Sequence, residues 1–207
     1  MEPNMPDLTF HTFHALRIKG FATVDTVAEI AVVSVDEARL HLSDLQQRGL
    51  ARFRETSSLW QLTPSGREHH AQQLLDDAAT AQAVEALRRP YEQFVQINHT
   101  FKVLCGDWQL RDGKPNDHTD TDYDGAAIAM LATINDQVTP VVEAFGDALA
   151  RLLPYSSRLT RCCQRLQAGE ANMFTGVACG SYHDVWMELH EDLILSQGID
   201  RAAEGSF

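Results

Sequence analysis

The sequence predicts a mainly α-helical protein, with a small two-stranded hairpin near its N-terminus and an all-helical bundle after it. Residues 34–48 repeat apolar side chains at three- and four-residue steps, which is the period of an amphipathic helix. Residues 50–62 instead contain two short alternating segments around a polar turn, as strands do. From residue 77 onward the helical period returns, so we place a domain boundary between residues 76 and 77.

Two short helices are expected at the start of the N-terminal domain. The first covers residues 10–19 and is closed by Gly20. Residues 21–23 form a short strand or an extended link, and residues 25–31 form the second helix. These elements precede the better marked third helix.

The third helix begins at Ser34. Ser34 and Glu37 have the spacing of a capping box, in which the hydroxyl accepts a backbone amide proton and the carboxylate reaches back to the cap. The helix ends at Arg48, where Gly49 supplies a left-handed stop. Its inner face carries Val35, Ala38, Leu42 and Leu45.

A β-hairpin follows this helix. Residues 50–53 and 59–62 alternate as strands, and residues 54–58 form the turn between them. Helix, turn, helix and hairpin in this order predict a winged helix-turn-helix domain, with residues 54–58 at the tip of the wing.

This segment resembles the winged-helix domain of MarR-like bacterial transcriptional regulators. In that family the second strand commonly runs into a Leu-Thr-Pro-x-Gly turn, which here is Leu62-Thr63-Pro64-Ser65-Gly66. The segments 105–111 and 182–193 also resemble the helical C-terminal half of certain actinobacterial winged-helix regulators. The resemblance implies a homodimeric transcriptional regulator whose partners are double-stranded DNA and an unknown small-molecule effector.

After the wing we expect a long helix over residues 64–87 and then a heptad-like run. The run keeps one seam facing a partner helix, and Asn98 is its polar member. Pro90 either begins a new helix or kinks a long one. The seam consists of Val84, Leu87, Tyr91, Phe94, Asn98, Phe101 and Cys105. Asn98 is favoured as a register or core hydrogen-bonding residue over a ligand contact.

The remainder of the chain predicts a long loop followed by four helices. Residues 106–124 lack any period and contain two glycines, one proline and many aspartates, which is typical of a functional loop when ordered. The helices are expected at 124–138, 140–153, 155–167 and 181–197, the last of them stopped by Gly198. Together they make residues 77–207 an all-helical dimerisation and effector-binding bundle.

The net charge of −12 is unusual for a protein that binds DNA, because phosphate neutralisation by Lys and Arg dominates that affinity. Residues 1–75 hold seven basic and nine acidic side chains, whereas residues 76–207 hold ten and twenty. The excess is thus mainly in the bundle. No apolar run has membrane length and no secretory signal is evident, so we expect a cytoplasmic protein without a membrane partner.

Four cysteines occur, at Cys105, Cys162, Cys163 and Cys179. They show neither the paired spacing of a metal site nor the density of a disulfide framework. We interpret them as buried structural thiols, with a redox sensor as the alternative.

Candidate DNA-binding residues lie on the outer face of the third helix and on the wing. The helix places Arg39, His41 and Ser43 near base edges, and Ser34 stands at its start. On the wing, we expect contacts with phosphate or the minor groove from Arg52, Arg54, Thr56 and Ser57.

Candidate ligand-binding residues centre on the last helix. His183, Met187, His190 and Ile194 share one of its faces, and Trp186 borders that face. A polar pocket with an aromatic wall is the hypothesis, although hydrogen-bonded core histidines are the favoured interpretation. Its expected residues are Asn98, Trp108, Gln109, His183, Trp186 and His190.

Other functions have weaker support. Residues 120–125 match the first half of an EF-hand loop, but Leu131 stands where a bidentate carboxylate is needed, so Asp120 and Asp122 are interpreted as helix-start residues. No catalytic or nucleotide-binding motif appears, and we predict no enzyme, metal or cofactor. Two alternatives remain: an interaction or ligand-sensing module that does not read DNA, and a metal-dependent enzyme. The metal site would comprise Asp117, His118, His183, Glu188 and His190.

Overall fold

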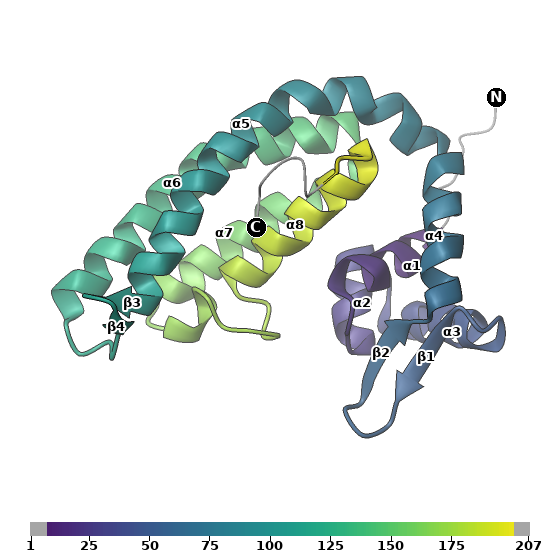
Figure 1. The fold of residues 1–207 in the computed structure, drawn as a ribbon, viewed down its shortest axis with the longest axis horizontal. Helices are drawn as coiled ribbons and strands as arrows, with labels where there is room; N and C mark the ends of the chain where they lie inside the picture. Colours follow the sequence, from purple (N-terminus) through teal and green to yellow (C-terminus); the bar gives the residue numbers. More distant parts are fainter. Residues whose placement is uncertain (1–7, 201–207) are drawn as a thin grey trace. The chain divides into compact units, whose positions relative to one another are not determined.

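The structure, a computed structural model, describes residues 8–200 (Figure 1). This part of the chain is mainly helical, with eight α-helices and two antiparallel sheets of two strands each. The chain divides into one unit that ends at Gln82 and another that begins at Ala83. The sequence-based boundary stands at residues 76/77.

The first unit consists of three helices, a hairpin and a fourth helix. In chain order these are α1 (Leu8–Lys19), α2 (Val24–Ala31), α3 (Val35–Gln47), β1 (Ala51–Arg54), β2 (Leu59–Leu62) and α4 (Pro64–Asp76). One apolar core joins them, built around Phe13, Leu16, Val27, Leu42, Leu45 and Trp60. The inner faces of α1 and α3 thus pack on the hairpin through its single tryptophan.

The start of α3 confirms the capping box. The Ser34 hydroxyl accepts from the Glu37 amide at 3.2 Å, and the Glu37 carboxylate accepts from the Ser34 amide at 2.9 Å. Val32, between α2 and α3, adopts φ 55°, and its amide hydrogen-bonds to the Ala28 carbonyl. At the other end, Gly49 has φ 73°, as expected for a left-handed stop.

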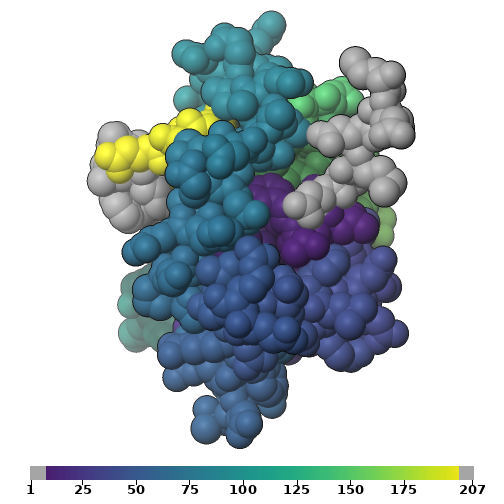
Figure 2. All heavy atoms as spheres, turned by 90° about the vertical axis from the view of Figure 1, so that its right-hand side faces the viewer, coloured from purple at the N-terminus to yellow at the C-terminus, as the bar shows by residue number. Residues whose placement is uncertain are grey.

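The hairpin pairs Ala51 with Leu62 and Phe53 with Trp60. Ala22 forms an isolated antiparallel bridge to Trp60, so the segment expected as a short strand touches the sheet at one residue. Figure 2 shows the hairpin, coloured blue, protruding from the helices of this unit. Gly66 follows on α4, where a Cβ would collide with the Leu50 carbonyl oxygen.

The helix expected over residues 64–87 is interrupted. Asp77 has an extended backbone, and its carboxylate accepts from the Thr80 amide at 2.9 Å, as at a helix start. A new helix, α5, then runs from Ala78 to Gln109. Pro90 lies inside α5, which answers the open question about this residue in favour of one long helix.

The second unit contains most of α5 and three further helices. These elements are β3 (Leu110–Arg111), β4 (Lys114–Pro115), α6 (Thr121–Ala148), the 3-10 turns η1 (Ala150–Leu152) and η2 (Ala171–Met173), α7 (Pro154–Gln167) and α8 (Tyr182–Gln197). The two helices expected at 124–138 and 140–153 merge into α6, which accommodates Pro140 and ends at Ala148, before η1.

The predicted loop over residues 106–124 is shorter in the structure. Residues up to Gln109 still belong to α5, and β3 and β4 pair as a small hairpin. Asp120 then starts α6, where its carboxylate accepts from the Tyr123 amide at 3.0 Å. The helix-start interpretation of Asp120 is therefore confirmed.

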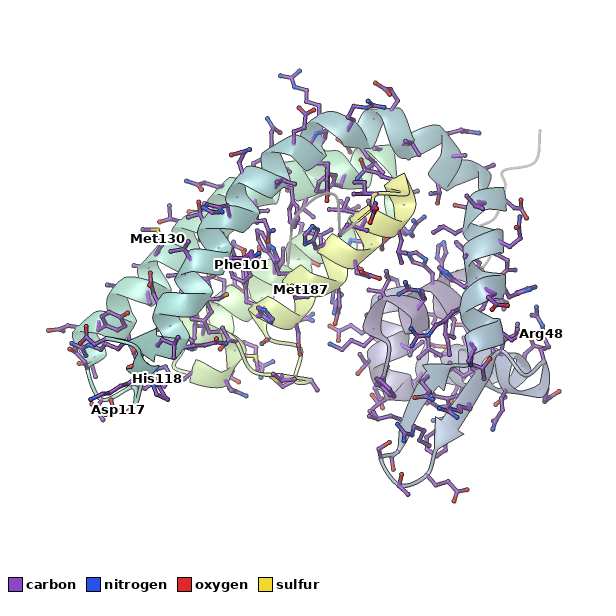
Figure 3. The ribbon with its side chains drawn as sticks, in the orientation of Figure 1. Arg48, Phe101, Asp117, His118, Met130 and Met187 are labelled. Atoms are coloured by element: carbon purple, nitrogen blue, oxygen red, sulfur yellow. The ribbon has the colours of Figure 1, made fainter. Side chains whose placement is uncertain are left out.

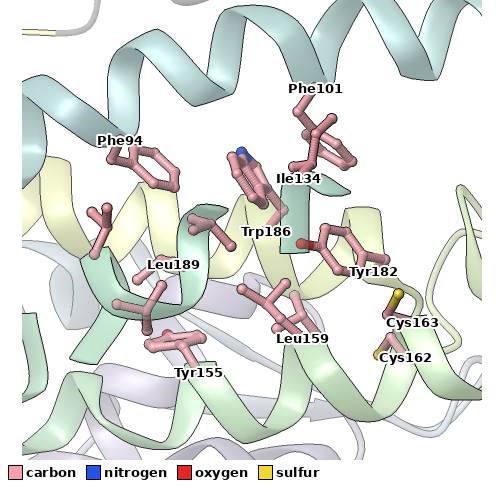
Figure 4. Packing of buried hydrophobic residues seen from close by; sticks show 14 of the residues in the cluster. Phe94, Phe101, Ile134, Tyr155, Leu159, Cys162, Cys163, Tyr182, Trp186 and Leu189 are labelled. Carbon is pink, nitrogen blue, oxygen red and sulfur yellow. The ribbon is translucent and has the colours of Figure 1, made fainter. Parts of the chain in front are cut away.

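Four helices contribute aromatic and aliphatic side chains to the core of this unit (Figure 4). Phe94 and Phe101 from α5 lie against Trp186 from α8, at ring-centroid distances of 4.9 and 4.4 Å. All members of the heptad-like seam except Val84 are buried within the chain. The seam therefore packs on the chain's own bundle.

Within residues 8–200, no helix is both long enough and apolar enough to cross a bilayer.

Candidate nucleic-acid interface and candidate ligand pocket

The outer face of α3 is exposed, and its arginines are paired with carboxylates. Arg39 pairs with Asp36 at 2.6 Å, and Arg48 pairs with Asp44 at 3.2 Å. Leu40 stands between these pairs in sequence with 70% of its surface exposed. Both arginines of the predicted recognition helix thus have a carboxylate partner on the same helix.

Two of the predicted DNA-binding residues hold α3 in place. Ser34 is engaged in the capping box, with its hydroxyl 2.6 Å from the Glu37 carboxylate. This interaction lowers the pKa of Glu37 below its usual range, through hydrogen bonds from the Ser34 side chain first and its backbone second. His41 is half-buried, with Nδ1 2.8 Å from the Thr12 hydroxyl of α1. Ser43 is also half-buried.

The hairpin presents its predicted residues at the surface. Arg52, Arg54, Thr56 and Ser57 are all exposed. Arg52 lies opposite Gln61, and turning the Gln61 amide lets its oxygen accept from the guanidinium. Arg54 stands over the ring of Phe21 at 5.9 Å. The strands and turn carry these two arginines against the single acid Glu55, so the hairpin is the more basic surface.

A pocket of about 330 Å³ lies between α5 and α8 in the second unit. It collects five of the six residues expected to bind a ligand, namely Asn98, Gln109, His183, Trp186 and His190. The other lining residues, which were not among the expected ligand-binding residues, are Phe101, Lys102, Cys105, Gly106 and Met187. Figure 3 shows Phe101 on α5 and Met187 on α8.

Helical phase explains this lining. The α5 residues follow Asn98 by three, four, seven, eight and eleven positions, and the α8 residues follow His183 by three, four and seven. Both sets are single helical stripes. Trp108 is ten positions after Asn98 and falls off the stripe. It is 4% exposed and packs on His118 and Phe174, with centroids 4.5 and 4.6 Å away.

Hydrogen bonds orient the pocket wall. The Trp186 indole N–H donates to the Asn98 side-chain oxygen at 2.8 Å, which ties α8 to α5. His190 Nε2 lies 3.4 Å from the Tyr91 hydroxyl, and both residues are buried. Burial raises the pKa of the Cys105 thiol to about 12, which keeps it protonated near neutral pH. No carboxylate is among the lining residues in the described part of the chain.

The opposite side of α8 holds two buried ion pairs. Glu188 accepts from Arg158 at 2.6 Å, and Asp192 lies 3.3 Å from Arg151. Every side chain of these two pairs is at most 9% exposed. α8 thus faces the pocket on one side and arginines of η1 and α7 on the other.

The residues of the metal-enzyme alternative do not come together. Glu188 is held by Arg158, and Asp117 accepts from the Thr119 hydroxyl at 2.7 Å. Figure 3 shows Asp117 and His118 in the loop before α6, apart from Phe101 and Met187 of the pocket. Within residues 8–200, no group of three or more His, Cys, Asp or Glu side chains is placed to hold a metal ion.

Three of the four cysteines are buried, as expected, and Cys179 is exposed. The interpretation as a buried thiol is therefore wrong for Cys179. It lies between α7 and α8, where a left-handed turn at Ala178 and Gly180 brings the chain back to the start of α8.

Comparison with known proteins gave no matching family model, no matching curated protein and no matching solved structure.

Proposed function

We propose that the first unit is a winged helix-turn-helix domain and that the chain is a DNA-binding transcriptional regulator with a small-molecule effector. The observation that carries this proposal is the succession of α2, a tight turn, α3 and an exposed hairpin with two arginines. α3 takes the role of the recognition helix, and the hairpin takes the role of the wing. A MarR-like relationship belongs to the same proposal.

The contacts divide between the two elements. Arg39 and Ser43 on α3 read base edges, for which Arg39 must exchange its Asp36 partner for DNA. Arg52, Arg54, Thr56 and Ser57 of the wing contact phosphate or the minor groove. Ser34 and His41 support the helix, because both are already engaged within the unit. In a homodimer, two such domains bind the half-sites of a pseudo-palindrome.

The pocket between α5 and α8 receives the effector. Its aromatic wall of Phe101 and Trp186 suits an apolar body, and His183, His190 and Lys102 supply donors. Without a lining carboxylate it favours a neutral or anionic ligand over a cation. Because α5 begins at Ala78 in the first unit, a ligand on Asn98 touches a helix that both units share. Differential binding to two conformations then shifts DNA affinity.

The wing is tested by fluorescence anisotropy with a labelled duplex from the upstream region of the protein's own gene. We expect salt-dependent binding, and Arg54→Ala should weaken it on any sequence and reduce the salt slope by about one ion. Arg88→Ala is the matched control, because Arg88 is an exposed arginine of α5 paired with Glu85. Equal binding by the two variants would remove the wing from the proposal.

The pocket is tested with 1-anilinonaphthalene-8-sulfonate, an apolar anion whose fluorescence rises in apolar sites. Met187→Glu adds a carboxylate at a lining position, and Val177→Glu adds the same charge at a residue that is 86% exposed. Met187→Glu should lose most of the probe binding, and Val177→Glu should retain it. Retention by both variants would contradict the effector pocket.

A second candidate is a protein-interaction module whose winged helix does not read DNA. It is favoured by the ion pairs that neutralise Arg39 and Arg48 and by the exposed Leu40 between them. The anisotropy experiment distinguishes the candidates. Absence of binding at low salt, where phosphate contacts are strongest, would favour the module.

A further inference from the structure

The segment between α7 and α8 carries an exposed cysteine next to a buried one. The Cys162 thiol on α7 donates to the carbonyl oxygen of Gly180 at 3.1 Å, and Gly180 is the residue directly after Cys179. Consecutive Cα atoms are only about 3.8 Å apart. The backbone that carries Cys179 therefore packs directly against the Cys162 side chain.

The two thiols differ in access. Cys179 is exposed, and its sulfur makes only a long contact with the Asn172 carbonyl oxygen, at 3.7 Å. Cys162 is 2% exposed and lies beneath the segment. Redox-sensing cysteines are solvent-accessible and often lie next to a resolving cysteine.

Arg165 adds a positive charge to this place. It pairs with Glu170 at 2.6 Å, which is the main reason its pKa is raised, and the nearby Cys162 and Cys179 contribute in the same direction. The Arg165–Glu170 ion pair therefore lies near both cysteines.

We propose that Cys179 and Cys162 form a reversible disulfide when the protein meets a hydroperoxide. The Cys179 thiolate attacks one peroxide oxygen, which breaks the O–O bond, forms a sulfenic acid and releases hydroxide that is protonated to water. Cys162 then loses its proton and attacks the Cys179 sulfur, forming the S–S bond and releasing the second oxygen as water. Two thiols lose two electrons, and one hydrogen peroxide becomes two waters.

The structural consequence falls on α8. Ser181, two residues after Cys179, caps α8 by accepting from the Asp184 amide at 3.1 Å, and the Cys179 amide donates to the Asp184 carboxylate at 3.0 Å. Both thiols must leave their carbonyl partners to bond to each other. The disulfide therefore displaces the start of the helix that carries His183 and Trp186.

The test uses the full chain, oxidised with hydrogen peroxide, alkylated and digested with trypsin without reduction. Cleavage after Arg161 and Arg165 places Cys162 and Cys163 in residues 162–165, and Cys179 in residues 166–201. The expected product is these two peptides joined, at a mass lower by two hydrogens than their sum. A reductant should separate them.

Variants assign the partner. Cys163→Ser should still give the joined peptides, whereas Cys162→Ser should lose them and accumulate sulfenic or sulfinic acid at Cys179. Circular dichroism checks that both variants are helical, and fragmentation of the wild-type product by mass spectrometry assigns the bonded sulfur without any variant. A product joined through Cys163 or Cys105, or oxidation of Cys179 without a bridge in the wild type, would overturn the proposal.

Discussion

The ion pair between Arg158 and Glu188 offers a sharp test of how α8 is held. Both side chains are at most 6% exposed and meet at 2.6 Å. In such surroundings, removal of one partner leaves a desolvated charge, which typically costs about 3–5 kcal/mol. We therefore expect Glu188→Gln, which keeps the shape and loses the charge, to reduce the free energy of unfolding of the second unit by about 3–5 kcal/mol.

Replacing both partners should restore stability. The double variant Arg158→Leu with Glu188→Leu removes the desolvation cost of both charges, so its free energy of unfolding should return to within about 1–2 kcal/mol of the wild type. Measured against the single variants Arg158→Leu and Glu188→Leu, the coupling energy of this double-mutant cycle should be several kcal/mol. These estimates follow from the short contact and the low exposure of both groups.

Urea denaturation in a Trp60→Phe background measures these effects. In that background the remaining tryptophans, Trp108 and Trp186, both belong to the second unit, so fluorescence reports on the bundle. Arg165→Leu combined with Glu170→Leu is a control, because that pair is about half exposed and should couple by less than about 1 kcal/mol. A Glu188→Gln variant within 1 kcal/mol of the wild type, or additive effects in the cycle, would refute the reasoning.

Three further predictions concern local structure. Gly66→Ala should destabilise the first unit by about 1–3 kcal/mol, because the added Cβ collides with the Leu50 carbonyl oxygen. Gly125→Ala should instead stabilise the second unit by about 0.5–1 kcal/mol, because Gly125 lies in α6 with open space around it. Thermal unfolding of the two variants compares these effects. Since the pKa of Glu37 is lowered in the folded state, its cap should be complete at neutral pH and lost as the pH falls through that lowered pKa. Acid titration should therefore lower the protection of the amides at the start of α3 relative to their intrinsic exchange rates, and Glu37→Gln should abolish this pH dependence. Thr12→Val should reduce the free energy of unfolding by about 0.5–1.5 kcal/mol in chemical denaturation, because His41 loses its hydrogen-bond partner. The same variant should shift the His41 ring signals in NMR spectra, and unchanged signals would contradict the contact.

Local signals predicted the helices that have strong caps. Ser34 with Glu37 marked the start of α3, and Ser181 and Gly198 marked the ends of α8. Each signal depends only on residues within one turn of the helix end, so it can be read from sequence.

The prolines could not be interpreted in the same way. Pro90 and Pro140 both lie inside long helices, although proline usually disrupts a helix interior. The surrounding residues Leu87, Tyr91, Val138 and Val141 are buried, so packing on both sides of each proline keeps the helix continuous. That packing involves residues far apart in the sequence, so it cannot be recognised from the residues next to each proline.

The pocket was partly predictable for a related reason. The His183, Trp186 and His190 stripe follows from the period of α8 alone. On α5 the loop was expected to begin at residue 106, so the helical stripe could not be followed beyond that residue, and Trp108 was included although it lies off the stripe. The exposure of Cys179 depends on a turn at Ala178, which has a positive φ. Alanine rarely adopts this conformation, so the sequence does not predict the turn.

The two faces of α8 have a consequence for how the lining of the pocket can change over evolution. The side that bears Glu188 and Asp192 fixes the rotation of the helix about its axis, because both carboxylates must meet arginines. The other side can then exchange His183, Met187 or His190 without turning the helix. The shape and polarity of the pocket can therefore change through single substitutions, whereas a change at the ionic side requires two substitutions at once.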